Sequence, residues 1–424
     1  MAGIIIKDLM ERIGFDRALT IENFSVVAFF FLNTVFLPAG LLYTTLLTPL
    51  FLLFLVKQRN LKGISWYLAL SLPLTWFYLT HGADGSTYLR SYILFSSAAI
   101  FTIWVYHFLR NQIKRPALYF RTIATYNAIF TGIALLFFLT PAGKQAFWSF
   151  EPIHPAIPTI PRLKMLVYEP SFYAFQLAPV VLYYFLSYMF TEGYKYLAAL
   201  CLLTVSLVFS LSFGVIGGLM IAVLLIILLH FFKLIRLRKL FFATFYLALG
   251  LIGLGLAVFY LMPANPLAER IDMIMNGYDT SANGRTWEAF VLAWKILEKT
   301  NYLLGAGLGQ IKEVGQDIIV NYYNYEGAWA DVVRIPNAMA ETLATFGILG
   351  AAARLMAEIG LFFYTRVYSN YYRFALFIFV FVYQFTGSYL TNIYEYLIWV
   401  LVFLPVFSQF NKEYIHNPGR KWKS

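Results

Sequence analysis

Residues 213–232, FGVIGGLMIAVLLIILLHFF, contain no Asp, Glu, Lys or Arg side chain. A helix of about 20 such residues is long enough to cross the hydrocarbon core of a bilayer. Across the whole chain, hydrophobic residues make up 60% and charged residues only 12%, whereas soluble domains carry about 25% charged residues. So few charges cannot cover the surface of a water-soluble protein of this length. The sequence therefore predicts an all-α polytopic membrane protein.

About twelve segments are apolar enough to be predicted as transmembrane helices. They are 20–38, 41–56, 64–80, 91–109, 118–139, 171–190, 196–211, 213–232, 240–262, 336–365, 374–390 and 393–409. The first two are divided at Pro38-Ala39-Gly40, a helix-stopping sequence. The segment 336–365 is longer than one span requires, so we expect it to be tilted or to extend beyond the membrane. The chain 1–424 is expected to form a single transmembrane domain.

The basic residues are distributed unequally between the two sides of these spans. Of the 32 Lys and Arg residues, 21 fall on one side and 10 on the other, with Arg354 inside a span. Membrane proteins collect Lys and Arg in their cytoplasmic loops. This rule places both termini in the cytoplasm, and it accounts for the net charge of +11 without a nucleic-acid partner.

Two long connections, 140–170 and 263–335, fall on the side with fewer charges, which this orientation makes the outer side. The first is rich in proline, and the second contains a helical pattern over 285–297. Its larger apolar residues recur along one side of that helix; they are Trp287, Phe290, Val291, Trp294 and Leu297. We expect this helix to lie along the membrane surface. Because the inner loops are short, any chemistry is expected at the outer face or in the membrane.

Motifs of soluble enzymes are missing from the sequence. It has no phosphate-binding loop of the Walker type, no HExxH and no Cys/His metal cluster. Its single cysteine, Cys201, excludes an internal disulfide. We therefore expect no cofactor and no metal ion.

Four basic residues of the outer connections lie close to predicted membrane spans. They are Arg162, Lys164, Arg285 and Arg334. Taken singly, each is most simply a solvated charge. Several together would bind a polyanion, because guanidinium groups form paired hydrogen bonds with phosphate oxygens. For a membrane protein, the polyanion that suits this position is a lipid-linked diphosphate.

Acidic residues at or inside predicted spans are the second group of candidates. Glu169 precedes Pro170 and Ser171 at the start of a span. There it either complements the helix dipole or, partly desolvated, acts as a general base. Three further acids, Glu341, Glu358 and Glu395, lie within spans. Arg354 and Glu358 are four residues apart on one helix face, which also allows a purely structural ion pair.

Several short motifs, taken in order, resemble the O-antigen polymerase and ligase superfamily. They are Gly284-Arg285-Thr286-Trp287, Gly305-Ala306-Gly307-Leu308-Gly309, Pro336-Asn337 and Phe346-Gly347-Ile348-Leu349-Gly350. Arg162 followed by Glu169-Pro170-Ser171 is similar to the polymerase branch of that family. The chain departs from the pattern in two places. Pro336 replaces a histidine that is associated with ligases, and the absence of this histidine favours a polymerase. Thr345 replaces an acid that is often found before the glycines.

The resemblance implies a fold of the GT-C type and a location in the bacterial inner membrane, with the active site facing the periplasm. It implies a metal-independent, inverting glycosyltransferase that moves a glycan from undecaprenyl diphosphate to a lipid-linked repeat unit. Glu169 and Arg285 are then the expected catalytic residues. The residues expected to bind diphosphate or glycan are Arg162, Lys164, Arg334, Asn337, Tyr323 and Tyr325. Trp329 could also stack on a sugar ring, and a chain-length regulator and a flippase are the expected protein partners.

Three other functions fit the same sequence. An O-antigen ligase would perform the same chemistry on a lipid A core acceptor. A polysaccharide flippase or other transporter suits twelve spans, although one long outer connection makes the two halves of the chain unequal. A non-catalytic scaffold for polysaccharide assembly is the third alternative.

The charge distribution makes a direct prediction about orientation. Cysteines introduced at positions 145 and 310 should react with a membrane-impermeant thiol reagent in intact cells, whereas a cysteine at position 236 should not. Labelling at 236 alone would reverse the topology and remove the outer-face site.

Overall fold

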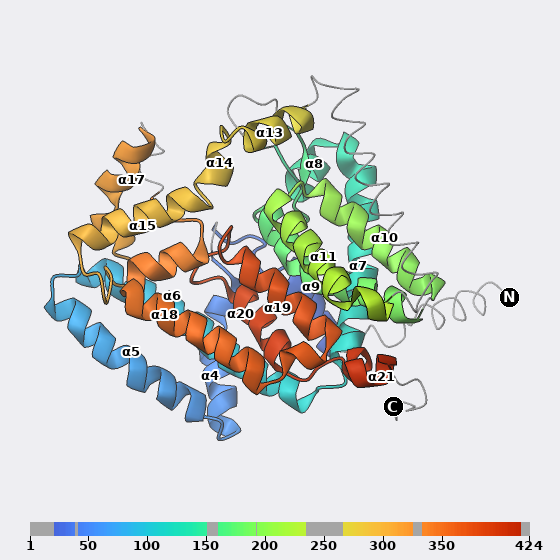
Figure 1. Cartoon of the computed structure of the whole chain (residues 1–424), viewed down its shortest axis with the longest axis horizontal. Coiled ribbons are helices and arrows are strands. Elements are labelled where there is room, and N and C mark those ends of the chain that lie inside the picture. Colours follow the sequence, from blue (N-terminus) through green and yellow to red (C-terminus); the bar gives the residue numbers. More distant parts are fainter. Residues whose placement is uncertain are drawn as a thin grey trace.

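The computed structural model describes residues 21–38, 41–150, 160–191, 193–234, 266–324 and 333–416. These residues are mostly helical (Figure 1). The strands among them are two short ones, β1 (Trp148–Ser149) and β2 (Arg162–Leu163), which pair antiparallel. The expected all-α architecture is therefore confirmed at this level.

A helix is present in each predicted span that lies within the described residues; segment 240–262 lies outside them. These helices are α2 (Ile21–Phe31), α3 (Tyr43–Leu46), α4 (Thr48–Lys57), α5 (Lys62–Thr80), α6 (Gly85–Asn111), α7 (Pro116–Leu136) with the 3₁₀ turn η2 (Phe137–Leu139), α9 (Pro170–Thr191), α10 (Tyr194–Phe209), α11 (Phe213–Leu234), α18 (Ala338–Tyr364), α19 (Tyr371–Tyr383) and α20 (Ile393–Phe403). By length and composition, four of the described helices can cross a membrane: α6, α7 with η2, α9 and α18. The chain is a helical membrane protein.

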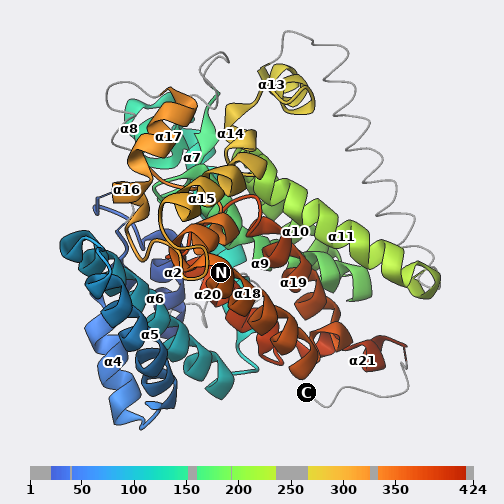
Figure 2. The ribbon, with the colours of Figure 1, turned by 60° about the vertical axis from the view of Figure 1, so that its left-hand side comes forward.

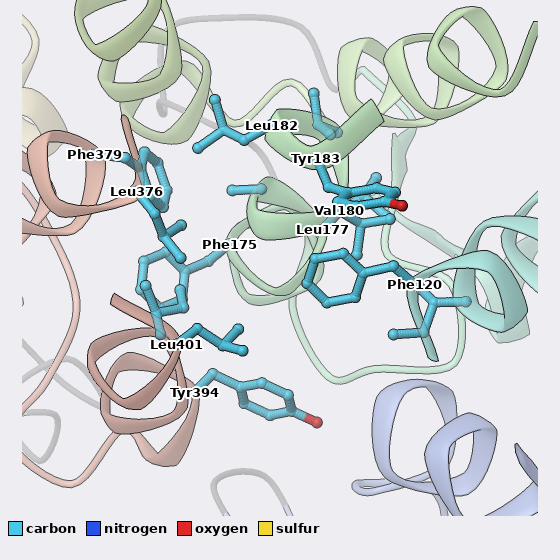
Figure 3. Packing of buried hydrophobic residues seen from close by; sticks show 14 of the residues in the cluster. Phe120, Phe175, Leu177, Val180, Leu182, Tyr183, Leu376, Phe379, Tyr394 and Leu401 are labelled. Atoms are coloured by element: carbon cyan, nitrogen blue, oxygen red, sulfur yellow. The ribbon is translucent and has the colours of Figure 1, made fainter. Parts of the chain in front are cut away.

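Helix α9 forms the centre of the fold. It is apolar on all sides, as expected of a helix surrounded by others, and it contacts α7, α10, α11, α19 and α20. Figure 3 shows Phe175 and Leu182 of α9 among side chains of the neighbouring helices, including Phe379 of α19 and Leu401 of α20. Since Glu169 directly precedes α9, this packing fixes the position of a candidate catalytic residue.

The outer helices expose large apolar side chains that water would not cover favourably. On α5, Trp66, Leu70 and Trp76 are 63%, 68% and 74% exposed. On α11, Leu228 and Leu229 are also exposed. A bilayer provides the apolar surroundings that these side chains require.

The described parts of both long connections lie at the same end of the molecule, and α21 (Lys412–His416) lies at the other end (Figure 2). The first connection contains α8 (Pro141–Phe147) and the β1–β2 pair. The second contains α13 (Pro266–Met275), α14 (Thr280–Asn283), α15 (Trp287–Lys299), α16 (Ile311–Val314) and α17 (Gln316–Tyr323).

The two outer positions chosen for thiol labelling differ in exposure. Gln310 is buried and hydrogen-bonded to the backbone of Asp84, whereas Gln145 on α8 is exposed. Position 145 is therefore the better outer reporter for thiol labelling.

Helix α18 is broken at Gly347, where φ is 66° and ψ is −167°. The prediction of one continuous helix over 336–365, tilted or extending beyond the membrane, was wrong, because the chain turns sharply at this residue. Arg354 Nη1 donates to Thr342 Oγ1 over 3.0 Å. In a straight helix these two residues would be displaced by about 18 Å along the axis. The part after Gly347, residues 348–364, is about 25 Å long and is the longer of the two.

The glycine-rich stretch 305–309 lies against this break. The N–H groups of Ala306 and Gly307 donate to the carbonyls of Ala344 and Thr345, both over 2.9 Å. A Cβ atom on Gly305 would come within 2.5 Å of the Gly347 nitrogen, and φ of Gly305 is +75°. Glycine is required here by close backbone approach and positive φ. This motif therefore joins two segments of the fold.

A group of buried charged and polar side chains connects the two parts of α18 to α19 and α20. Arg354 donates to Glu358 over 3.0 Å, which confirms the i,i+4 pair, and it also forms an ion pair with Glu395. Gln384, just after α19, donates to Glu358 over 2.7 Å. Buried charges are tolerated at membrane depth only when such partners surround them.

Replacement of Gly347 by alanine should destabilise the protein strongly. The added Cβ would lie 2.3 Å from the Leu303 carbonyl oxygen, and a side chain in this backbone conformation alone costs roughly 1–3 kcal/mol. Thermal unfolding of the purified protein measures the effect. Gly360→Ala is the matched control, because Gly360 lies in the same helix and a Cβ atom added there would meet no other atom within 4 Å; there we expect a gain of about 0.5–1 kcal/mol. Equal unfolding temperatures for the two variants would contradict the role of Gly347.

Candidate functional site

A small cavity at the end of the molecule that carries the long connections brings together four distant segments of the chain. It is open to solvent and has a volume of about 30 Å³, enough for about two water molecules. The side chains that line it are Tyr168, Glu169, Ser171, Phe172, Phe175, Arg285, Pro336, Tyr383, Ser388, Tyr389 and Asn392. Both residues that the sequence suggested as catalytic, Glu169 and Arg285, belong to this set.

Glu169 is held at the start of α9 by local contacts. Its backbone carbonyl accepts the N–H of Tyr173 over 3.1 Å, which begins the helix. Pro170 occupies the first helical position, where its missing N–H costs nothing. The Ser171 hydroxyl donates to the Glu169 carboxylate. The carboxylate thus has a fixed direction at the cavity wall and is half-buried.

Arg285 lies between α14 and α15, and Asn337 holds its backbone. The Asn337 amide donates to the Arg285 carbonyl over 2.8 Å and to the Phe385 carbonyl over 2.7 Å. Its Oδ1 accepts the N–H of Ala340 over 2.8 Å and so caps α18. Asn337 is fully buried. Its side-chain amide and Oδ1 are engaged by the protein, so Asn337 positions the Arg285 backbone; a role in binding substrate stays a prediction.

The charges of the candidate residues act on the same phenol group. Burial raises the pKa of Tyr389; the positive charges of Arg334 and Arg285 oppose this rise, and Glu169 adds to it. Arg334 is exposed, and its guanidinium lies 5.4 Å from the centre of the Tyr389 ring. Burial likewise raises the pKa of Tyr168, and the negative charge of Glu169 adds to it. Glu169 and Arg285 therefore line the cavity, and Arg334 stands beside its wall residue Tyr389 without lining the cavity itself.

A further arginine stands near Arg285. Arg270 of α13 forms an ion pair with the fully buried Asp279 over 3.1 Å and lies over the ring of Phe213. Burial lowers the pKa of Arg270. The negative charge of Asp279 raises this pKa, and the like charge of Arg285 lowers it further. Because Asp279 neutralises Arg270, this pair supports the α13–α14 segment and adds little positive charge to the cavity.

Three more of the expected binding residues do not line the cavity. Arg162 Nε donates to the Ser210 carbonyl at the end of α10 over 3.2 Å. Lys164 follows β2, next to Arg162 and outside the cavity lining. Tyr323 donates to Glu288 over 3.0 Å, at the side of α15. Tyr325, like Trp329, lies outside the described residues.

The connection between α19 and α20 is the part of the site that the sequence did not reveal. The apolar pattern predicts a span over 374–390, but α19 ends at Tyr383, and Ser388, Tyr389 and Asn392 reach the cavity. The polar run Gln384 to Asn392, which includes Gly387, was a usable signal because it interrupts the apolar pattern. Glu341 accepts the N–H of Leu390 over 2.6 Å and fixes this connection.

The arrangement offers a fixed carboxylate beside guanidinium groups. Within the described residues, no three His, Cys, Asp or Glu side chains are placed to hold a metal ion. Glu169 and Arg285 form no ion pair within the described part of the chain. A carboxylate can accept a proton, and guanidinium groups can stabilise phosphate oxygens.

Comparison with known proteins adds no homologue: no family model and no curated protein matches the chain.

Asn337 provides a test of how Arg285 is positioned. Asn337→Asp keeps the size and the helix cap but loses both amide donors, so the carbonyls of Arg285 and Phe385 lose their partner. Each buried group left without a partner costs roughly 1–3 kcal/mol. We expect a clear fall in the unfolding temperature of Asn337→Asp and no fall for Asn276→Ala, an exposed residue after α13. An unchanged unfolding temperature for Asn337→Asp would contradict this role.

Proposed function

We propose that the chain is a polysaccharide polymerase of the bacterial inner membrane. It transfers a glycan from undecaprenyl diphosphate to a lipid-linked repeat unit, at the face of the membrane where the two long connections lie. The observation that supports the proposal is that Glu169 and Arg285 line one cavity, with Arg334 beside its wall residue Tyr389. Glu169 is more than a hundred positions from the two arginines. The sequence motifs suggested Glu169 and Arg285 for this chemistry, and the position of Arg334 near a predicted span suggested it as a binding residue.

The reaction requires a base and a stabilised leaving group. The acceptor sugar hydroxyl attacks the anomeric carbon of the donor glycan, and the bond from that carbon to the diphosphate oxygen breaks. The hydroxyl proton passes to the Glu169 carboxylate, and the departing diphosphate takes the bonding electrons. Arg285 and Arg334 stabilise its negative charge, since preorganised cations act strongly in a site of low dielectric. One displacement of this kind inverts the anomeric carbon.

The cavity is open to solvent, so the glycans reach Glu169 and Arg285 through its mouth. Tyr389 is the wall residue whose ring lies beside the exposed Arg334. Aromatic rings such as those of Tyr168 and Tyr389 offer apolar faces against which a sugar ring can pack.

The periplasmic placement rests on the distribution of Lys and Arg between the two sides of the spans. The donor and acceptor are both lipid-linked glycans, and membrane lipids surround the spans. A flippase would supply such substrates and a chain-length regulator would act on the product. An acceptor other than a repeat unit would make the protein a ligase instead.

Substitution of the central residues tests the proposal in an assay with purified protein and a lipid-linked repeat unit, read as a ladder of products. Arg285→Ala should reduce the rate by roughly 10²- to 10³-fold, the loss typical of a donor aimed at developing charge. Arg285→Lys should recover only part of the rate, because an ammonium cannot form paired hydrogen bonds with the diphosphate. Glu169→Gln should be as severe, since an amide cannot take the proton. Arg334→Ala should mainly weaken donor binding.

The controls are Lys299→Ala and Glu298→Gln, which change the same charges at exposed positions near the end of α15. Both should give a normal ladder. If Glu169 only complements the dipole of α9, Glu169→Gln should cost a few tenths of a kcal/mol of stability, about 0.3, and little activity. A normal ladder from both Arg285→Ala and Glu169→Gln would end the proposed mechanism.

A further inference from the structure

Helix α15 has two apolar faces, and the structure covers only one of them. Its buried side chains are Ala289, Leu292, Ala293, Ile296 and Leu297. They pack against α18, which lies alongside α15. On the opposite side, with about 3.6 residues per turn, stand Trp287 and Trp294, which are 57% and 46% exposed. Phe290 and Val291 flank them and are partly exposed.

Three of the four charged residues of α15 lie on an edge between these two faces; the fourth, the exposed Glu298, lies in the last turn on the same side as Trp294. Glu288, Lys295 and Lys299 fall together on one edge of the helix. A helix surrounded by water would carry polar residues across its whole outer side. A protein face, a lipid face and a polar edge between them describe a helix lying in a membrane–water interface.

The apolar outer surface of α15 continues into a membrane span. The Trp294 ring packs on Tyr302 with centres 5.6 Å apart. The carbonyls of Tyr302 and Leu303 accept the N–H groups of Ile348 and Leu349 over 2.9 and 3.1 Å. Leu303, Ile348 and Leu349 are exposed.

These residues stand at the head of the spanning part of α18. Further along it, Met356, Ile359 and Phe363 are exposed and form the lipid-facing side of that helix. Tryptophan and tyrosine at the end of such a surface are typical of the interfacial aromatic belt.

We propose that α15 lies in the interface of the bilayer, with Trp287, Trp294, Tyr302 and Leu303 in contact with lipid. This placement does not depend on the proposed enzymatic activity. The placement nevertheless has a consequence for the proposed activity, because Arg285 is two residues before Trp287. The cavity is then at the depth of the lipid head groups, where the diphosphate of a lipid-linked substrate lies.

The test uses the full-length protein in liposomes, with Cys201 replaced by serine because it is free and exposed. Single cysteines at positions 294, 303 and 299 carry an environment-sensitive fluorophore. All three positions are exposed, so the label disturbs little packing. Fluorescence is measured with lipids that carry a nitroxide quencher near the head group and, separately, with iodide in the aqueous phase.

We expect the labels at 294 and 303 to be quenched by the nitroxide lipid and protected from iodide, with blue-shifted emission. The label at 299, on the polar edge, should be quenched by iodide. Iodide quenching at 294 and 303 would show that this face is turned to water and would overturn the proposal. Protection of both positions from both quenchers would also overturn it, by showing that another protein surface covers the face. Since the readout is independent of catalysis, an inactive protein can still support the inference.

Discussion

The candidate site depends on the break in α18 at Gly347. A break in a helix leaves backbone groups without hydrogen-bond partners, and here a second segment of the chain supplies those partners. The carbonyls of Ala344 and Thr345 accept N–H groups from the stretch 305–309, and the N–H groups after the break donate to Tyr302 and Leu303. Non-helical backbone at this depth is stable only when protein groups replace water in this way. Glycine is needed because no side chain fits between the two segments.

The break turns the first part of α18 toward the cavity. This part begins at Asn337, which holds the carbonyl of Arg285 with its amide group. The Arg354 guanidinium reaches back to Thr342 and across to Glu395, so the two parts of α18 and α20 form one unit. Arg285 is therefore positioned by contacts that begin among the buried helices. The long outer connection that carries Arg285 does not have to be rigid by itself.

The sequence predicted the helices well, since long apolar runs are a strong signal. It did not predict which side of α15 is buried, because the large residues Trp287 and Trp294 dominate the pattern while the packed side is rich in alanine, such as Ala293. Close packing of two helices favours small residues, and these carry little weight in a hydrophobic pattern. Glu169 and Arg285 became candidates through a resemblance of motifs. No local sequence pattern could show that they line the same cavity, because packing between distant segments brings them there.

The distribution of paired charges separates the candidate site from the rest of the interior. Within the described residues, every fully buried charged side chain has partners. Asp279 binds Arg270, Glu358 and Glu395 bind Arg354, and Arg373 donates to the carbonyls of Val402 and Phe403. Charges withdrawn from water are costly unless compensated in this way. Glu169 and Arg285 are half-buried at one cavity and form no ion pair there, so their charges remain available to a ligand. An unpaired carboxylate and an unpaired guanidinium at one cavity suit the binding of an anion beside a proton acceptor.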